Sequence, residues 1–400
     1  YPEILGKYQE RYQYIFVDEY QDTNAAQYFL TKALANRHQN LFAVGDIAQS
    51  IYSWRGADYH NVLRLKDDFP NLTVINLEQN YRSTQNILDA AYGVISQNHS
   101  HPVLHLWTQK EKGEKICLYN GTSEEDEARF IAEKIIELTQ NGYQNDQIAI
   151  LYRTNAQSRI LEEVLLHYNL NYKLIGGVRF YERREIKDVL AFLRALVNPQ
   201  DSLAWQRIEK IGKRIKGKWE KFSQENKPSR KLESAKLVKL ALEESGYLGK
   251  LNPEKEEDLS RIENIKELVS VAQNFPNIDD FLANIALMEE EYFPQGKLES
   301  QNGQAAAVNL MTLHRAKGTE FPVVFISGLE EGLLPHYRAL NNPQELEEER
   351  RLCYVGLTRA QEKLFLTLAS RRLLFGKKSC NSPSRFLTNI PEKLINLINY

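Results

Sequence analysis

Short apolar runs of strand length alternate with helical patterns along most of this chain, and no other feature constrains its fold as strongly. The runs occupy residues 14–17, 42–44, 72–77, 116–119, 148–152, 308–313, 323–326 and 364–368. Between two of them, Ser123 stands in capping-box relation to Asp126, and helical spacing follows at Ala128, Ile131, Ile135 and Leu138. The alternation predicts an α/β fold in which helices cover a parallel sheet.

The middle of the chain has a different pattern. From about residue 182 to 303 the strand runs stop and amphipathic helices take over, as at Val189, Leu190, Leu193 and Leu196. Strand patterning returns at Val308, after a polar segment at residues 301–304. We therefore expect an all-helical subdomain inserted into the α/β part, with a polar linker at its end.

Composition narrows the class of protein. No apolar run approaches the length of a membrane span, and the start of the chain has no basic-apolar leader. The three cysteines, Cys117, Cys353 and Cys380, lie far apart, which predicts neither a disulfide framework nor a zinc site and fits a reducing cytoplasm. The first residue is Tyr1 rather than Met, so we expect a fragment or a processed chain.

Charge is distributed unevenly. The net charge of −2 argues neither for nor against nucleic acid, but residues 207–239 hold twelve Lys or Arg against four Asp or Glu, a local balance of +8. Such a stretch either contacts phosphates or is a solvated helix face. Charge alone does not separate these two interpretations.

The first apolar run ends in two carboxylates. Asp18 and Glu19 follow residues 14–17, which we expect to be a buried strand, and they emerge at the edge where open α/β sheets bind ligands. In a nucleotide-hydrolysing site the first acid would hold Mg²⁺ and the second would position or deprotonate the attacking water. Such acid pairs also cap helices and solvate loops. The sequence contains no Gly-x-x-x-x-Gly-Lys-Ser/Thr segment, so half of the expected phosphate site is missing.

The apolar run at residues 42–44 is followed by a glutamine and by two aromatic residues that are candidates for ligand contacts. Gln49 could sense a γ-phosphate or orient water through its amide. Tyr52 and Trp54 alternate with polar residues in a segment that ends at Gly56. Exposed rings there suit stacking on unpaired bases, worth roughly 1–3 kcal/mol each. The alternative for both rings is packing in the core.

Three later segments carry further candidates. Arg82 offers a planar cationic fork for phosphate oxygens, and Tyr81 offers a face for a purine ring. His314 could hydrogen-bond a nucleic-acid phosphate, and Glu320 could accept from a ribose hydroxyl. Arg359, near the end of an expected helix, is a candidate arginine finger. The alternatives are a structural histidine and a surface salt bridge.

The order of these segments resembles the superfamily 1A DNA helicases of the UvrD, PcrA and Rep type. The resemblance rests on residues 18–24, 49–56, 80–83, 153–159, 314–321, 330–336, 354–360 and 384–387. It implies RecA-like parallel sheets, with ATP held between two motor domains. The implied units are part of the first motor domain at 1–80, the second motor domain at 81–181 and 304–400, and a helical accessory subdomain at 182–303.

The resemblance also implies a set of residues around ATP and Mg²⁺. Asp18 would bind the metal and Glu19 would act as the catalytic base. The γ-phosphate would be contacted by Gln49, Arg82 and Arg359, with Arg55 as an additional helper. Tyr81 would stack on adenine and Glu320 would take the ribose.

A second set would contact DNA. Tyr52 and Trp54 would stack on single-stranded bases, and the strand would also be contacted by Arg153, Asn155, His314 and His336. Lys213 and Lys216 lie in a Gly-containing segment, residues 208–218, that loosely resembles a helix-hairpin element meeting the duplex backbone.

We therefore expect a piece of an ATP-dependent 3′–5′ DNA helicase of DNA repair or replication, with single-stranded and duplex-junction DNA as its partners. Because the phosphate loop is missing, we expect the 400 residues to hydrolyse little or no ATP by themselves. The alternative, from a different class, is a helicase-derived module that binds DNA or a protein without hydrolysis.

Overall fold

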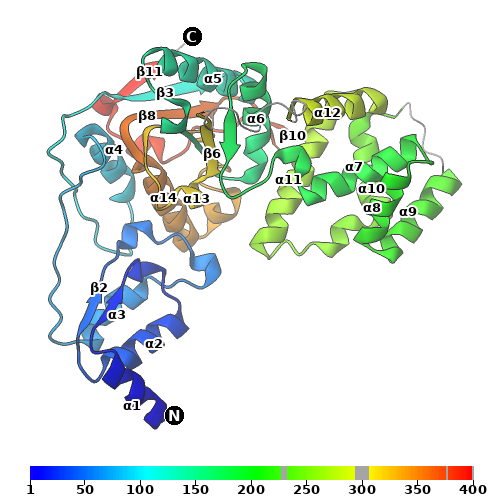
Figure 1. Ribbon diagram of the computed structural model, residues 1–400. Helices are drawn as coiled ribbons and strands as arrows, with labels where there is room; N and C mark the ends of the chain where they lie inside the picture. Colours follow the sequence, from blue (N-terminus) through cyan, green and yellow to red (C-terminus); the bar gives the residue numbers. More distant parts are fainter. Residues whose placement is uncertain (227–231, 293–305, 375–376, 399–400) are drawn as a thin grey trace, which may run out of the picture.

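The computed structural model describes residues 1–226, 232–292, 306–374 and 377–398. Figure 1 shows three parts: a small N-terminal unit, a larger unit built on a sheet, and a block of helices beside that sheet. The segments that precede and follow the helical block in sequence share one sheet. No helix in these ranges is long and apolar enough to cross a bilayer.

The N-terminal unit packs its helices on one face of a small sheet. Its elements are α1 (Pro2–Arg11), β1 (Ile15–Val17), α2 (Ala25–Ala35), β2 (Leu41–Ala43) and α3 (His60–Asp68), with short 3₁₀ turns η1 (Tyr20–Asp22), η2 (Ile47–Gln49) and η3 (Ser53–Arg55). β1 and β2 pair in parallel, with Ile15 opposite Leu41. The core beneath them contains Tyr20, Tyr28 and Leu65.

Two expectations for this unit were wrong. The run at residues 14–17 is not buried: Phe16 is 74% exposed, and its neighbour Phe42 on β2 is 58% exposed. The reason is that Ile15 and Val17 face the helices, whereas Phe16 points to the face that the described helices leave uncovered. The expected strand at 72–77 does not form, because no neighbouring strand in the described part of the chain supplies its hydrogen bonds, and Ile75 there is 75% exposed.

The larger unit confirms the expected α/β fold class. Its seven strands lie in the order β11-β3-β8-β7-β4-β6-β5, and every neighbouring pair is parallel. The strands are β3 (Ile116–Gly121), β4 (Ile148–Tyr152), β5 (Tyr172–Leu174), β6 (Val308–Thr312), β7 (Phe321–Ile326), β8 (Ala360–Ala369) and β11 (Ile395–Ile398). A separate hairpin joins β9 (Arg372–Leu374) and β10 (Lys377–Ser379).

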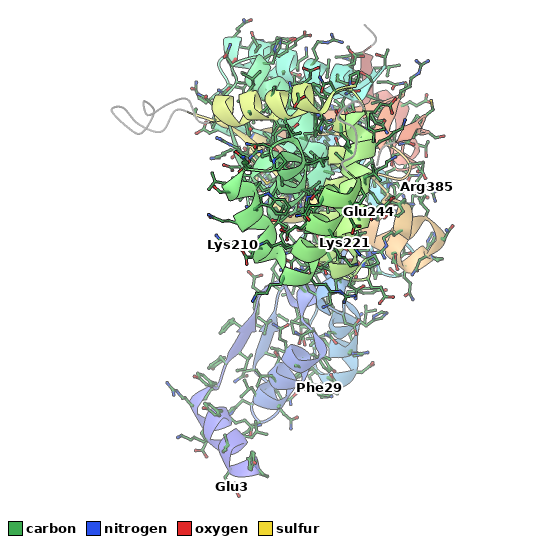
Figure 2. The ribbon with its side chains drawn as sticks, turned by 90° about the vertical axis from the view of Figure 1, so that its right-hand side faces the viewer. Glu3, Phe29, Lys210, Lys221, Glu244 and Arg385 are labelled. Atoms are coloured by element: carbon green, nitrogen blue, oxygen red, sulfur yellow. The ribbon has the colours of Figure 1, made fainter. Side chains whose placement is uncertain are left out.

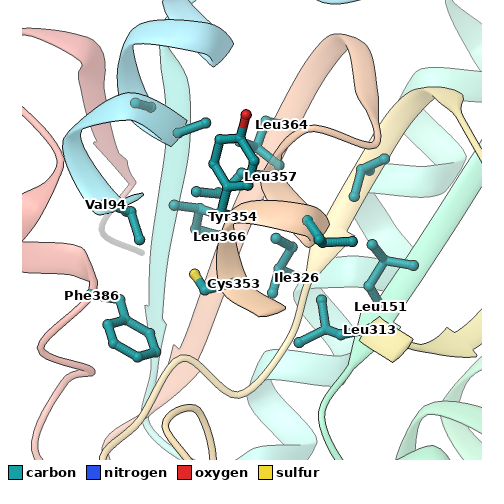
Figure 3. Packing of buried hydrophobic residues seen from close by; sticks show 14 of the residues in the cluster. Val94, Leu151, Leu313, Ile326, Cys353, Tyr354, Leu357, Leu364, Leu366 and Phe386 are labelled. Carbon is teal, nitrogen blue, oxygen red and sulfur yellow. The ribbon is translucent and has the colours of Figure 1, made fainter. Parts of the chain in front are cut away.

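Helices cover both faces of this sheet. The helices α4 (Gln85–Ile95), α13 (Leu313–Ala316) and α14 (Pro343–Leu357) pack on one face, and α5 (Glu124–Gln140) and α6 (Ser158–His167) on the other. Ala149 and Leu151 of β4 therefore enter one core, and Ile148 and Ile150 the other. Figure 3 shows the first core, where Leu151, Cys353 and Phe386 contribute side chains. Burial of each such side chain contributes about 1.5–3 kcal/mol.

The expected start of α5 is confirmed. Ser123 is its N-cap, and the hydroxyl of Ser123 accepts a hydrogen bond from the Asp126 amide at 3.2 Å. The Asp126 carboxylate accepts from Thr122 rather than from Ser123. The four apolar positions at helical spacing are all buried.

The block beside the sheet is helical throughout its described residues. Its helices are α7 (Arg184–Val197), α8 (Ser202–Ile211), α9 (Lys213–Asn226), α10 (Ser234–Ser245), α11 (Glu256–Ala272) and α12 (Ile278–Tyr292). Its core contains fully buried Phe192 and Trp219, whose rings pack edge to face at 5.5 Å. The polar seam expected at residues 301–304 and the unit boundary at 303 lie outside the described residues.

Candidate functional site

The acidic pair lies where β1 ends. Glu19 has φ of 49° and ψ of 44°, a left-handed conformation that is uncommon for a residue with a side chain and stores strain. The Gln21 amide donates to Glu19 Oε2 at 2.5 Å, and its oxygen accepts from the Asp46 amide at 2.9 Å. A Cβ at Gly45 would meet that oxygen at 2.6 Å, so a side chain at this position would displace the Gln21 amide. Gln21 therefore fixes the Glu19 carboxylate against the loop that follows β2.

A lysine of the larger unit reaches these acids. Lys317 Nζ forms an ion pair with Asp22, lies 3.5 Å from Glu19 Oε2 and donates to the Gln49 carbonyl at 2.8 Å. Burial raises the pKa of Asp22 above its usual value, and Lys317 opposes that rise. Sequence patterns did not identify Lys317 as a site residue. Its local sequence feature is that it directly precedes Gly318, where a φ of +83° turns the chain.

A chain of contacts near the boundary between the N-terminal unit and the larger unit joins Arg82, Glu320 and Gln361. Arg82 Nε donates to Glu320 Oε2 at 2.6 Å, and the Gln361 amide donates to Glu320 Oε1 at 2.9 Å. The hydrogen bond from Arg82 lowers the pKa of the Glu320 carboxyl below its usual value. Tyr81, next to Arg82, is 77% exposed, so its ring is open to a ligand.

Arg359 lies just beyond the end of α14 and is buried, which excludes the alternative of a surface salt bridge. Its guanidinium donates to the carbonyls of Val355 and Thr319 at 2.9 and 3.1 Å. Burial, and next the charge of Arg82, lower the pKa of Arg359 to about 10, while Glu19 across the boundary raises it. Arg82 is paired with Glu320, whereas the described hydrogen bonds of the Arg359 guanidinium go to oxygens without full charge, so an anion beside Arg359 is favoured.

Few of the described side chains at this site could bind a metal ion. Among the described residues, no group of three or more His, Cys, Asp or Glu is arranged to hold a metal ion. Asp18 is exposed, and one of its oxygens accepts from the Glu19 amide at 2.9 Å. Mg²⁺ commonly uses one or two carboxylates together with substrate phosphates and waters, so a single exposed aspartate fits that mode of binding. Gln49 lies at the end of η2, where its side-chain amide donates to the Asp46 carboxylate at 2.8 Å.

A cavity of about 630 Å³ lies apart from these groups. Its walls come from all three parts of the molecule: the η3 segment, the larger unit and α11 of the helical block. We call it the strand cavity. Six of the eight residues expected to contact DNA line it, namely Tyr52, Trp54, Arg153, Asn155, His314 and His336.

The aromatic residues of the strand cavity differ from each other. Trp54 is 48% exposed, so it is not a core residue. Tyr52 is half-buried, packs against the core of the larger unit and donates from its hydroxyl to the His314 carbonyl at 3.1 Å. Arg55 also lines the cavity, with its guanidinium 4.5 Å from the centre of the Trp54 ring. The structure thus places Arg55 beside Trp54 at the strand cavity.

Two polar residues of the strand cavity are each held by a carboxylate. Arg153 forms a two-pronged ion pair with Glu349, and His336 Nε2 lies 3.0 Å from Glu263 Oε1. Burial, and next the charge of Arg153, lower the pKa of His314 well below its usual value, so this ring is neutral at neutral pH. Sequence patterns gave no indication of Glu349 or Glu263, since neither lies in a segment with a recognisable role.

Lys213 and Lys216 do not line the strand cavity. They lie on the first turns of α9, after Gly212 with φ of +155°, and Lys216 pairs with Glu209 at 3.3 Å. Figure 2 shows Lys210 and Lys221 on the same helical block. A solvated helix face remains a sufficient account of this geometry.

The parallel sheet and the side chains gathered at its strand ends define an α/β protein of the class that binds ligands at that edge. Residues 75–227 and 213–371 match the UvrD-like helicase C-terminal domain, and residues 1–70 match the UvrD/REP helicase N-terminal domain. The chain therefore belongs to the UvrD-like helicase family.

Similar proteins include those named ATP-dependent DNA helicase PcrA. That of Bacillus subtilis (strain 168) is 45% identical over 446 residues, covering 100% of this chain and 60% of the relative. Those of Staphylococcus epidermidis (strain ATCC 35984) and Staphylococcus aureus (strain Mu50) are 42% identical, covering 98% of this chain and 60% of each relative. The chain thus spans about three fifths of the length of these curated relatives.

One solved structure, described as the C-terminal domain of a possible DNA helicase from Lactobacillus plantarum WCFS1, covers 80% of this chain and 98% of its own. Its TM-score is 0.34 at 12% identity, too low to carry an argument.

Proposed function

We propose that this chain forms part of an ATP-dependent DNA helicase that moves 3′ to 5′ along one strand. The observation that carries this proposal is the boundary between the two sheet-containing units, where Lys317 lies 3.5 Å from Glu19 and Arg82 Nη1 donates to the carbonyl of Thr358, next to Arg359, at 3.3 Å. Glu19 acts on the pKa of Arg359 although 340 positions separate them in sequence. The relatives named as ATP-dependent DNA helicases support the same assignment.

At the nucleotide, Arg82 and Arg359 are the ligands for the negative charge that develops on the γ-phosphoryl group. Glu19, held by Gln21, accepts a proton from the attacking water, and Gln49 orients that water. Glu320 accepts from the ribose and the open Tyr81 ring stacks on adenine. Mg²⁺, held by Asp18 together with the phosphates, would neutralise phosphate charge.

At the strand cavity, Trp54 and Tyr52 stack on unpaired bases, while Arg55, Arg153 and His336 contact the backbone. His314 is neutral and donates or accepts a hydrogen bond without adding charge. Lys213 and Lys216 meet the duplex ahead of the strand through phosphates alone. The scattered cysteines, of which Cys117 and Cys353 are buried, accord with work in the cytoplasm.

The 400 residues alone have a second, narrower function under this proposal: they bind single-stranded DNA without hydrolysing ATP. The sequence has no Gly-x-x-x-x-Gly-Lys-Ser/Thr segment to cradle the phosphates, whereas the strand cavity is lined by residues from all three parts of the molecule. Robust DNA-stimulated ATPase activity of these 400 residues would contradict this statement.

The test of the helicase proposal uses the polypeptide encoded by the complete gene. ATP hydrolysis should rise severalfold on addition of single-stranded oligonucleotide. A duplex with a 3′ tail should be unwound, and a duplex with a 5′ tail of equal length should not. Binding of both tailed duplexes without hydrolysis would instead favour a non-hydrolysing module.

A further inference from the structure

A buried carboxylate lies behind the strand cavity. Glu349 is on α14, its side chain is 8% exposed, and it is not among the side chains that line the cavity. Its partner Arg153 does line the cavity and has a side chain that is 12% exposed. Glu349 therefore acts on the cavity only through the residues it holds.

Glu349 holds two lining residues at once. Arg153 Nε donates to its two oxygens at 2.9 and 3.1 Å, and Arg153 Nη2 lies 2.8 Å from Oε1. The backbone amide of His336 donates to Oε2 at 2.8 Å. One carboxylate thus joins two segments that lie far apart in the chain and meet at the same wall.

The pairing leaves part of the arginine fork for a ligand. Glu349 takes the Nε–Nη2 edge of the guanidinium, so Nη1 stays outside the pair. The ring of His336 is held in turn by Glu263 from α11. A buried ion pair adds little net stability, because desolvation offsets the attraction, and its value lies in fixing geometry.

We propose that Glu349 is a positioning residue of the strand cavity, which holds Arg153 and the His336 backbone where they meet the phosphates of a single strand. This rests on the proposed binding of single-stranded DNA in that cavity. Arg153 held in this way contacts phosphate with one edge of a fixed fork.

The proposal predicts that loss of the Glu349 carboxylate changes the affinity for DNA in the direction opposite to that expected from electrostatics alone. Loss of a negative charge near a nucleic-acid site strengthens binding of a polyanion when only the field matters. Loss of the carboxylate that orients Arg153 weakens binding, because the arginine no longer meets the phosphate. Glu256 supplies the matched control, since it also lines the cavity but is exposed and belongs to α11.

The experiment measures binding of a fluorescein-labelled oligothymidine to the 400-residue chain by anisotropy at several salt concentrations. Glu349→Gln should weaken binding about tenfold and lower the slope of log Kd against log salt by about 0.7, the value of one phosphate contact on a single strand. Glu256→Gln should tighten binding. Tighter or unchanged binding by Glu349→Gln would overturn the proposal.

A double-mutant cycle separates positioning from a general loss of structure. Arg153→Gln should weaken binding to the same degree, and Glu349→Gln should add nothing further in the Arg153→Gln background. Additive losses would overturn the proposal. If Glu349→Gln lacks the wild-type circular dichroism spectrum, Arg153→Lys replaces it as the test variant, because lysine keeps the charge but not the planar fork. Arg153→Lys should lose most of the same affinity for the oligonucleotide. Full affinity would overturn the proposal.

The same measurements separate this inference from the proposed function. If both Trp54→Ala and Arg153→Gln bind the oligonucleotide as the wild type does, the strand is not in this cavity and both proposals fail. If those two variants weaken binding and Glu349→Gln does not, only the positioning role fails.

Discussion

The strand cavity and the region around Arg82 and Arg359 hold their charges differently. At the strand cavity, Arg153 and His336 are each paired with a carboxylate, Glu349 and Glu263 respectively. In the other region Arg82 pairs with Glu320, whereas the described hydrogen bonds of the Arg359 guanidinium go to carbonyl and hydroxyl oxygens. Burial, and next the charge of Arg82, lower the pKa of Arg359, which carries a positive charge that a bound phosphate would balance.

This difference predicts that variants at the two places change different quantities, turnover at one and affinity at the other. Changes at Arg359 and Glu19 should act on turnover, because charge there is balanced most fully when phosphoryl charge develops. Changes in the strand cavity should act on affinity, because its groups are preorganised. The turnover experiments below use the polypeptide encoded by the complete gene.

The largest effect is expected for Arg359→Ala. Loss of this guanidinium should lower ATP turnover about 10³-fold, the lower end of the range for arginine fingers, with oligonucleotide affinity unchanged. Steady-state ATPase assays and anisotropy measure the two quantities. Arg359→Lys is the control for charge without the fork, and it should recover only part of the rate. A parallel loss of strand affinity in a folded Arg359→Ala protein would break the comparison.

The next effect is expected for Glu19→Gln. The variant should hydrolyse ATP about 10²-fold more slowly or worse, since an amide cannot accept the proton of the attacking water. Binding of a fluorescent ATP analogue should persist, because Glu19 is not a phosphate ligand. Glu10→Gln, at an exposed glutamate of α1, is the matched control. Unchanged turnover in Glu19→Gln would remove Glu19 from the role of base.

A smaller effect is expected for Trp54→Ala. Removal of a ring that is 48% exposed should weaken oligothymidine binding about tenfold through lost stacking, with little change in the free energy of unfolding. Anisotropy and urea denaturation measure these quantities. Trp219→Ala, at a fully buried ring of the helical block, should show the reverse pattern. Strong destabilisation by Trp54→Ala would return Trp54 to the core.

The smallest effect concerns pH. Because the pKa of His314 is lower in the folded protein than its usual 6.5, the unfolded chain binds a proton that the folded chain does not, and stability falls as pH drops below 6.5. Replacement His314→Gln should remove this part of the loss, about 1 kcal/mol between pH 7 and 5.5. Urea denaturation at both pH values tests it. An equal loss in both proteins would show that His314 is not held neutral.

Sequence patterns predicted much of the larger unit and little of how its parts meet. The run at residues 148–152 predicts a buried strand because every residue is apolar, and β4 is that strand. The run at 72–77 is also rich in apolar β-branched residues, but a strand needs a neighbour to complete its hydrogen bonds. Composition reports burial preference and carries no information about which neighbours are present.

For the candidate site too, the sequence named several residues but not the contacts between distant segments. The resemblance to UvrD-type helicases implied Glu19, Arg82 and Arg359 as residues for one nucleotide. The contacts made by Lys317 with Asp22, and by Glu349 with Arg153, were not predictable, because these partners are 295 and 196 positions apart and neither pairing leaves a local pattern.

The sequence by itself determined the α/β class, the helical middle of the chain and the family, because these depend on periodicity and on the order of short segments. Only the tertiary structure decided that Phe16 faces outward, that Arg55 lies with Trp54, and that Glu349 holds Arg153. The physical reason is that burial and ion pairing depend on which distant segments pack together.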